Sequence, residues 1–267
     1  MSPERLLEYF ERISEAPDAI PRLRRFILDL AVRGKLVEQD PADEPAEELL
    51  KRVKFKKQEL IRKGAIRKPK DVPEFSEAKG PFPLPASWAW VYLAQVGGII
   101  GGGTPPSKDA SCFAEPGTGI PWLTPADLGN QAGHTASHGT RDLTEDGLTR
   151  SSAQLMPKGT VLFTSRAPIG YVAIAENEIS TNQGFKSVVP FISEMNHYIA
   201  VYFRAFGPWI NERASGTTFK EVSGKTVSYL PFPLPPLAEQ HRIVAKVDEL
   251  MALCDELEAA QAKREDR

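Results

Sequence analysis

Cysteine is scarce in this sequence of 267 residues, and long apolar runs are missing. The two cysteines, Cys112 and Cys254, form no CxxC pair, so we expect no disulfide framework and a reducing compartment. No stretch reaches the roughly 18 apolar residues of a membrane-spanning helix. The opening MSPERLLEYFERISEAPDAI is charged and lacks the apolar segment of a secretory signal. These absences predict a soluble, cytoplasmic protein with no membrane partner.

A surplus of positive charge is also absent, since 33 Lys and Arg are balanced by 35 Asp and Glu. Any nucleic-acid site must therefore be a local patch. One such patch lies between Lys51 and Lys70, where ten Lys and Arg face a single acid, Glu59. The stretch is either a solvated helix face or a set of phosphate contacts.

Signatures of catalysis are missing too. Gly101, Gly102 and Gly103 follow an apolar run, but no GK[ST] or GxGxxG pattern accompanies them, which favours a flexible turn over a nucleotide site. There is no [ND]PP[YF] tetrapeptide of an adenine methyltransferase, and the one [DE]xK lies in a Pro-rich segment. His134, His138 and Cys112 form only a weak metal pattern. We expect a non-enzyme that needs no cofactor and no metal.

Both ends of the chain have helical periodicity. Residues 1–70 are expected to form helices that begin at Ser2-Pro3, end near Gly34 and end again near Gly64. The expected helix over 236–267 starts at Pro235-Pro236. Its apolar residues recur at intervals of four and three, as do those of the second N-terminal helix, which predicts either a coiled-coil seam or an ordinary bundle helix. The seam residues are Ile243, Val247, Leu250, Cys254 and Leu257, with Leu23, Ile27 and Leu30 on the N-terminal side.

The middle of the chain, residues 91–235, has short β-type runs between turn clusters and one helix candidate, MNHYIAVYFRAFGPWINERA. The β-type runs are VYLAQVGGII, GIPWL, GTVLFTS, YVAIAE and FKSVVP. We predict an α+β fold in which a mixed, mostly antiparallel sheet is flanked by long helices. A Pro-rich linker over 71–90 precedes it, and Trp88 and Trp90 are expected to pin the first strand to the core.

Several segments closely resemble specificity subunits of type I restriction–modification systems. The resemblance lies in TFKEVSGKTVSYLPFPLPPLAEQHRIVAKVDELMALCDELE, LRRFILDLAVRGKLVEQDPADEPAEELLKRV, LPASWAWVYL, GGTP followed by GIPWLTPADL, and PKGTVLFTSRAPIGYVAIAENEISTNQGFKSVVP. It implies a target recognition domain over 91–235 that contacts half of a bipartite DNA site. It also implies that the helices act as a spacer and dock modification subunits, which bind AdoMet and methylate adenine. A restriction and translocation subunit would be an indirect partner.

The candidate contacts to double-stranded DNA lie on the loops of this domain. Arg grips guanine, and Asn or Gln grips adenine, through paired hydrogen bonds, although Asn and Gln in turns also cap the backbone. The candidates are Thr104, Ser107, Lys108, Thr124, Ser165, Arg166, Thr181, Asn182, Gln183, Lys186, Thr217, Thr218 and Lys220. Residues shared by members that recognise different sequences more often stabilise the domain than contact bases. Base contacts are therefore also expected in loops 129–150 and 206–220.

Members of this family usually carry two recognition domains and two helical regions, whereas this chain has one of each, with the helical region split between its ends. Two copies could pair head to tail through the seam residues and rebuild a two-domain subunit. Alternatively, the chain is a fragment, because AAQAKREDR stops within a helical pattern. A further alternative is a helical interaction module, such as an anti-restriction or assembly factor, whose β domain binds protein instead of DNA.

Overall fold

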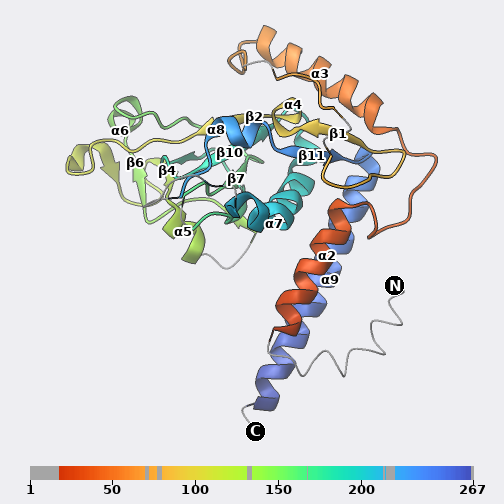
Figure 1. Ribbon diagram of the computed structural model, residues 1–267. Helices are drawn as coiled ribbons and strands as arrows, with labels where there is room; N and C mark the ends of the chain where they lie inside the picture. Colours follow the sequence, from red (N-terminus) through yellow and green to blue (C-terminus); the bar gives the residue numbers. More distant parts are fainter. Residues whose placement is uncertain are drawn as a thin grey trace.

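The computed structural model describes residues 18–69, 72–76, 80–130, 134–166, 168–212, 214 and 220–265. The helices are α2 (Ala19–Val32), α3 (Ala46–Arg62), α4 (Leu93–Val96), α5 (Pro125–Asn130), α6 (Glu145–Thr149), α7 (Asn196–Glu212), α8 (Gly224–Ser228) and α9 (Leu237–Glu265), with 3-10 turns at Ala110–Cys112 and Ser193–Met195. The strands are β1 (Ala89–Tyr92), β2 (Gly97–Gly101), β3 (Phe113–Ala114), β4 (Ile120–Leu123), β5 (Thr135–Ala136), β6 (Arg141–Leu143), β7 (Val161–Phe163), β8 (Val172–Ala175), β9 (Ser180–Thr181), β10 (Lys186–Pro190) and β11 (Pro231–Leu234). Figure 1 shows a β-rich body from which α2 and α9 extend side by side.

The strands of the described residues form three sheets, one of which is the pair β1-β11. A five-stranded sheet has the order β2-β10-β7-β8-β5, and a four-stranded sheet has the order β3-β6-β4-β9. Neighbours are antiparallel except for β5 with β8 and β4 with β9, which are parallel. The α+β class with mixed, mostly antiparallel sheets and long helices is confirmed. The domain division predicted from the sequence stays a prediction, although β1 begins beside its boundary near residue 90.

Helix α7 forms the centre of the main core. Its buried aromatic face packs on the five-stranded sheet, where Phe203 stacks on Phe163 with ring centroids 4.3 Å apart. The helix candidate over MNHYIAVYFRAFGPWINERA is confirmed, with Pro208 inside the helix. Trp88 and Trp90 are both buried, and their indole N–H groups donate to Glu239 and to the carbonyl of Phe82. The two tryptophans are therefore part of the scaffold, as expected.

The Pro-rich run before α9 forms strand β11, which pairs with β1 alone. Proline has no N–H to donate, so Pro231 and Pro233 must occupy the positions whose backbone faces away from β1. The hydrogen bond from Leu93 N to Leu230 O agrees with this alternation, because it places the residue before Pro231 in a position that faces β1. The carbonyls of the two prolines accept from the hydroxyls of Tyr202 and Tyr198 in α7, at 3.0 and 3.1 Å. The prolines thus fix β11 between β1 and α7.

The predicted β run VYLAQVGGII is interrupted in the structure, because its middle forms the single helical turn α4. The side-chain oxygen of Gln95 accepts from Tyr92 N at 2.7 Å and closes this turn. Leu93 and Val96, three residues apart, are both fully buried. Helical spacing buries both side chains, whereas a strand would place them on opposite faces. The continuous strand predicted there is wrong.

Helices α2 and α9 pack antiparallel as a pair. Arg24, early in α2, forms ion pairs of 2.7 and 2.8 Å with Asp255 and Glu258, late in α9. At the other end Asp43, in the loop after α2, binds Arg242 near the start of α9 at 2.6 Å.

Among the helices of the described residues, none is apolar enough over a sufficient length to cross a bilayer.

Glycines end the two N-terminal helices where the sequence predicts. Gly34 follows α2 with φ of 65°, and Gly64 follows α3 with φ of 68°. Both values lie in the left-handed region that glycine adopts without cost. The first expected helix, at Ser2-Pro3, lies outside the described residues.

Candidate nucleic-acid interface

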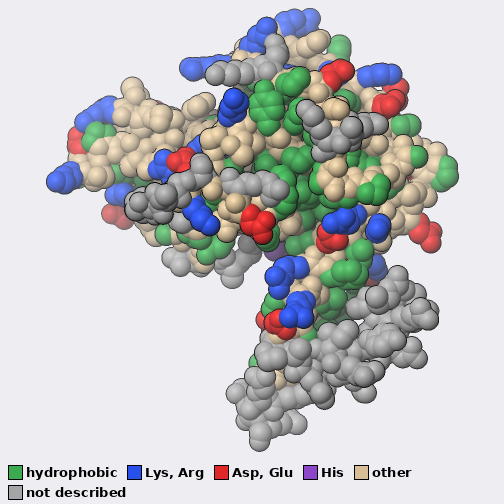
Figure 2. All heavy atoms as spheres, viewed as in Figure 1, with side chains coloured by type: hydrophobic (Ala, Val, Ile, Leu, Met, Phe, Trp, Pro, Cys, Tyr) green, Lys and Arg blue, Asp and Glu red, His purple; other side chains and the backbone are tan. Residues whose placement is uncertain are grey.

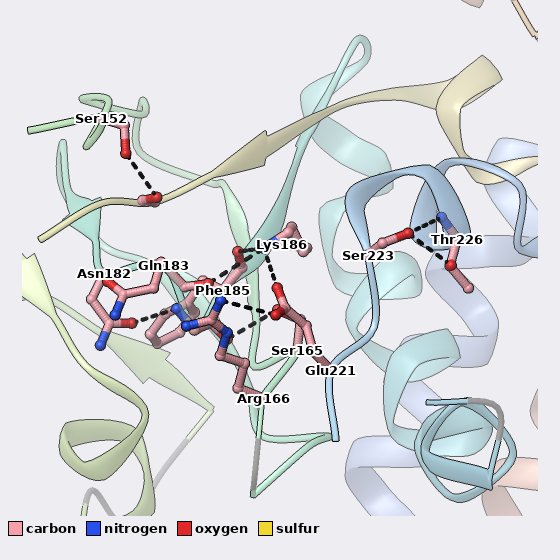
Figure 3. A network of polar contacts seen from close by, with 12 residues as sticks. Ser152, Ser165, Arg166, Asn182, Gln183, Phe185, Lys186, Glu221, Ser223 and Thr226 are labelled. Carbon is pink, nitrogen blue, oxygen red and sulfur yellow. Dashed lines mark hydrogen bonds and ion pairs between the residues drawn. The ribbon is translucent and has the colours of Figure 1, made fainter. Parts of the chain in front are cut away.

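Loops from four parts of the chain meet at one end of the five-stranded sheet. We call the residues Thr104, Arg166, Gln183, Lys186 and Glu221 at this place the polar edge. Figure 3 shows Arg166, Gln183, Lys186 and Glu221 from close by. The edge forms because β10 lies between β2 and β7, and because a bridge joins the backbones of Arg166 and Glu221. Side chains far apart in sequence are therefore brought into one network.

The glycine turn that precedes Thr104 packs closely against the chain itself. A Cβ on Gly102 would lie 2.0 Å from the carbonyl oxygen of Asn182 and 2.2 Å from that of Thr181. Gly103 N donates to Thr181 O at 2.9 Å, and its carbonyl accepts from Trp122 Nε1 at 3.0 Å. Close approach thus requires glycine here, as expected, but the group approached is the backbone beside β9.

Two cations share one carboxylate at the polar edge. Arg166 Nη2 lies 2.9 Å from Glu221 Oε2, and Lys186 Nζ lies 3.5 Å from Glu221 Oε1. The Lys186 ammonium also donates to the carbonyls of Gln183 and Phe185, at 3.3 and 3.2 Å. Burial raises the pKa of Glu221, but Arg166 and Lys186 together outweigh it and hold that pKa below its usual range.

The two amide side chains at this edge have different roles, because Asn182 caps the backbone of its turn and Gln183 is exposed. Asn182 Oδ1 accepts from Gly184 N at 2.8 Å, which is the backbone cap that turns favour. Gln183 is exposed, and its side-chain oxygen accepts from the hydroxyl of Thr104, which is also exposed. Gln183 is therefore the amide that a duplex could reach without disturbing a turn.

Three candidates have structural roles. Ser165 and Thr181 are fully buried, and the Ser165 hydroxyl donates to Gly184 O at 3.1 Å. Thr124 donates through both its backbone N–H and its hydroxyl to Asp127 Oδ2, each at 2.7 Å. These contacts stabilise the loops that carry the polar edge. None of the three presents a free group to a base edge.

The remaining DNA candidates lie on the surface or outside the described residues. Ser107, Lys108 and Lys220 are exposed. Thr217 and Thr218 lie outside the described residues. Lys186 also lines a hollow of about 610 Å³ together with Lys225, Gly101 and Gly224. The glycines leave backbone accessible beside two ammonium groups, an arrangement that suits a phosphate.

The seam residues are placed within a single chain. Ile243, Val247, Cys254 and Ile27 are buried. Leu23, Leu30, Leu250 and Leu257 are half-buried around them. In this chain α9 packs on α2 and α7, so the seam is occupied by helices of the same chain. Pairing of two copies through the seam stays a prediction. Phe26 and Leu253, which are 40% and 47% exposed, remain on the surface of this helix pair.

Five of the ten cations of the basic stretch form ion pairs with acids in the part of the chain that the structure describes. Lys51, Arg52, Lys54, Lys56 and Lys63 form ion pairs with Glu44, Glu48, Glu59 and Glu74. Hydrogen bonds from Lys63 and then Lys56 lower the pKa of Glu59 to about 2. Figure 2 shows the Lys and Arg side chains over α3, with acids among them. This pairing favours the solvated-face interpretation of the stretch.

The weak metal pattern does not come together. Cys112 is buried and free, whereas His134 lines a hollow of about 290 Å³ between α7 and α9 with Arg204. Burial, and then the charge of Arg204, lowers the pKa of His134. No group of three or more His, Cys, Asp or Glu that could hold a metal occurs within the described ranges.

Sequence reasoning missed Glu221, although one signal was available. It is the single acid between Glu212 and Glu239, and it stands between Lys220 and Lys225. An isolated carboxylate in a basic, glycine-containing loop needs a cation partner when it is partly buried. The partners, Arg166 and Lys186, come from distant loops, so their identity required the fold.

Residues 85–265 match the family of the type I restriction modification DNA specificity domain. The MjaIX specificity subunit of Methanocaldococcus jannaschii is 37% identical over 60% of this chain and 37% of its own length. The EcoAI specificity subunit of Escherichia coli is 28% identical over 95% of this chain and 43% of its own length. The chain thus spans less than half the length of these relatives.

A likeness in fold extends over the whole chain. The HsdS subunit from Thermoanaerobacter tengcongensis aligns with a TM-score of 0.53 at 23% identity, over 97% of this chain and 52% of that one. A chain from a structure of complex assembly and conformational transition of the type I R-M system aligns with a TM-score of 0.58 at 23% identity, over 100% and 56%. With the family match covering most of the sequence, this chain belongs to the type I restriction modification DNA specificity domain family.

Proposed function

We propose that this chain recognises a DNA sequence and contacts one half of a bipartite target through its polar edge. The observation that carries this proposal is the gathering of Arg166 and Gln183, on loops, and Lys186, at the start of β10, at one edge of the family domain. Arg166 has the forked donors that match guanine O6 and N7, and Gln183 has the donor and acceptor that match adenine. Lys186 and Lys225, beside the hollow, suit the phosphate backbone.

The proposed role is recognition without catalysis. Modification subunits that dock on the helix pair would carry the methylation, and a restriction and translocation subunit would join through them. The exposed Phe26 and Leu253 are the apolar side chains that such a partner would cover. Because the seam is filled within the chain, the docking surface is the outer face of α2 and α9.

Selection of binding sites from a random duplex library by the purified full chain tests the recognition. We expect enrichment of one short motif, and a binding constant that falls steeply as salt rises. Arg166→Gln should degrade the motif at one position and weaken binding by about tenfold to a hundredfold, because one paired contact to a base is lost. Lys158→Gln, at an exposed lysine of the same domain, is the matched control and should leave the motif intact. Failure of the wild-type chain to enrich any motif would refute the proposal.

Co-purification with the modification subunit of the same system tests the docking surface. The double variant Phe26→Ala, Leu253→Ala should lose the subunit while it keeps its duplex motif, since the two surfaces lie on different parts of the fold (Figure 1). Sedimentation of the chain alone distinguishes homodimer formation from docking. A concentration-dependent dimer that the double variant abolishes would assign the same face to a second copy instead.

A further inference from the structure

Glu221 is held in place by the backbone, not only by its charge partners. The backbone of Glu221 forms an antiparallel β-bridge with that of Arg166, and the next residue, Val222, donates its N–H to Ser165 O at 2.8 Å. These bonds fix the position of the Glu221 backbone, and so the point from which its carboxylate extends between the two loops. From there its two oxygens reach Arg166 and Lys186 separately, as Figure 3 shows.

The two cations differ in how firmly they are held. The Lys186 side chain is 15% exposed, its stem lies beside Gly224, and its ammonium has two carbonyl acceptors besides Glu221. The Arg166 side chain is 42% exposed, and among the described residues its side chain pairs with Glu221. Arg166 is therefore the group that can exchange Glu221 for another acceptor without leaving a buried carbonyl unpaired.

An acid at this position lowers the attraction of the edge for any phosphate. Two cations beside one carboxylate present a net charge of about one instead of two. Phosphate attraction is the sequence-independent part of DNA binding and grows with the net charge of the edge, whereas the contact of Arg166 with guanine depends on O6 and N7 at one base pair. A carboxylate competitor thus weakens non-specific binding more than binding at a matched base pair.

We propose that Glu221 is a specificity-determining residue, which holds Arg166 and Lys186 away from DNA phosphates until a matching base edge takes its place on Arg166. This rests on the proposed function, because it assumes that the polar edge contacts DNA. Glu221 acts through the two cations and is a positioning residue, not a base contact.

The test compares wild-type chain, Glu221→Gln and Glu176→Gln on two duplexes over a series of salt concentrations. One duplex carries the motif that the wild type selects, and the other a scrambled sequence. Glu221→Gln should bind the scrambled duplex about threefold to tenfold more tightly, and its binding constant should fall more steeply with salt, by about one ion. The ratio of its affinities for the motif and the scrambled duplex should fall by the same factor. Glu176, an exposed acid of the same domain, should change neither quantity when replaced.

Glu221→Asp keeps the charge and should restore wild-type slope and ratio, which a purely structural role for the side chain would not predict. Thermal unfolding confirms that each variant is folded. Unchanged slope and ratio in a folded Glu221→Gln variant, or weaker binding to both duplexes, would overturn the proposal. A wild-type chain that selects no motif would refute the proposed function instead, and the salt slope on the scrambled duplex would then show only whether Glu221 lowers the attraction of the polar edge for phosphate.

Discussion

Trp88 Nε1 donates to Oε2 of Glu239 across 2.9 Å, and this bond joins the segment before β1 to the first turn of α9. Gln39 Nε2 donates to the other carboxylate oxygen at 2.6 Å, from the loop after α2. Glu239 is 1% exposed. One buried carboxylate therefore ties together both halves of the helical region and the β domain.

The stability of this junction should depend on pH. Burial raises the pKa of Glu239, although the bonds from Trp88 and Gln39 act against it. The folded chain thus holds the proton more tightly than the unfolded chain, in which a glutamate has a pKa of about 4.3. Relative to Glu239→Gln, the wild type should be most stable below that pH and should lose stability as pH rises through the folded pKa.

Urea unfolding of both chains between acid and neutral pH measures this difference. Each unit by which the pKa is raised corresponds to about 1.4 kcal/mol. Glu256→Gln, on an exposed part of α9, is the matched control for the replacement of a carboxylate by an amide. A pH-independent difference for Glu239→Gln would show that the buried carboxylate does not titrate as expected.

Gly102→Ala should damage the polar edge. The added Cβ would meet two backbone carbonyl oxygens, which cannot rotate away as a side chain could. We expect a loss of about 1–3 kcal/mol in the free energy of unfolding, and weaker duplex binding. Gly98→Ala, in the same strand β2, is the matched control, because its Cβ would have Val189 O as nearest neighbour at 4.0 Å. Equal losses for the two variants would contradict the close-approach argument.

The helix pair should depend on its apolar seam more than on its ion pairs. Ile243→Ala removes a fully buried side chain and should cost about 2–5 kcal/mol. Arg24→Ala removes two ion pairs whose acids are mostly exposed, and should cost roughly 0–1 kcal/mol. Denaturant unfolding of the two variants compares them directly. A larger loss for Arg24→Ala would show that charge, not packing, holds α2 on α9.

Local signals in the sequence were enough to predict much of the fold. Gly34 and Gly64 marked helix ends through their conformational freedom, and the four-and-three spacing marked the buried face of α9. Periodicity could not say which helix covers that face, because α2 lies more than two hundred residues away in the sequence. The helical turn α4 was predicted as strand because four residues are too few to show a helical period, and apolar strands flank them on both sides.

The candidate site was predictable in residue type but not in role. Ser165 and Thr181 have side chains that suit DNA, yet the fold buries both. Asn182 caps its own turn, whereas its neighbour Gln183 is exposed, a distinction that depends on backbone direction alone. The link from Glu221 to Arg166 spans two loops distant in sequence, so only the fold could reveal it.

The alternating prolines of β11 have a consequence for the surface of the domain. A strand whose outward positions are Pro231 and Pro233 has no N–H there with which to recruit a further strand. The carbonyls that remain are engaged by Tyr198 and Tyr202. The β11 edge of this ribbon can therefore neither accept a further strand nor serve as a template for the strand of a neighbouring molecule.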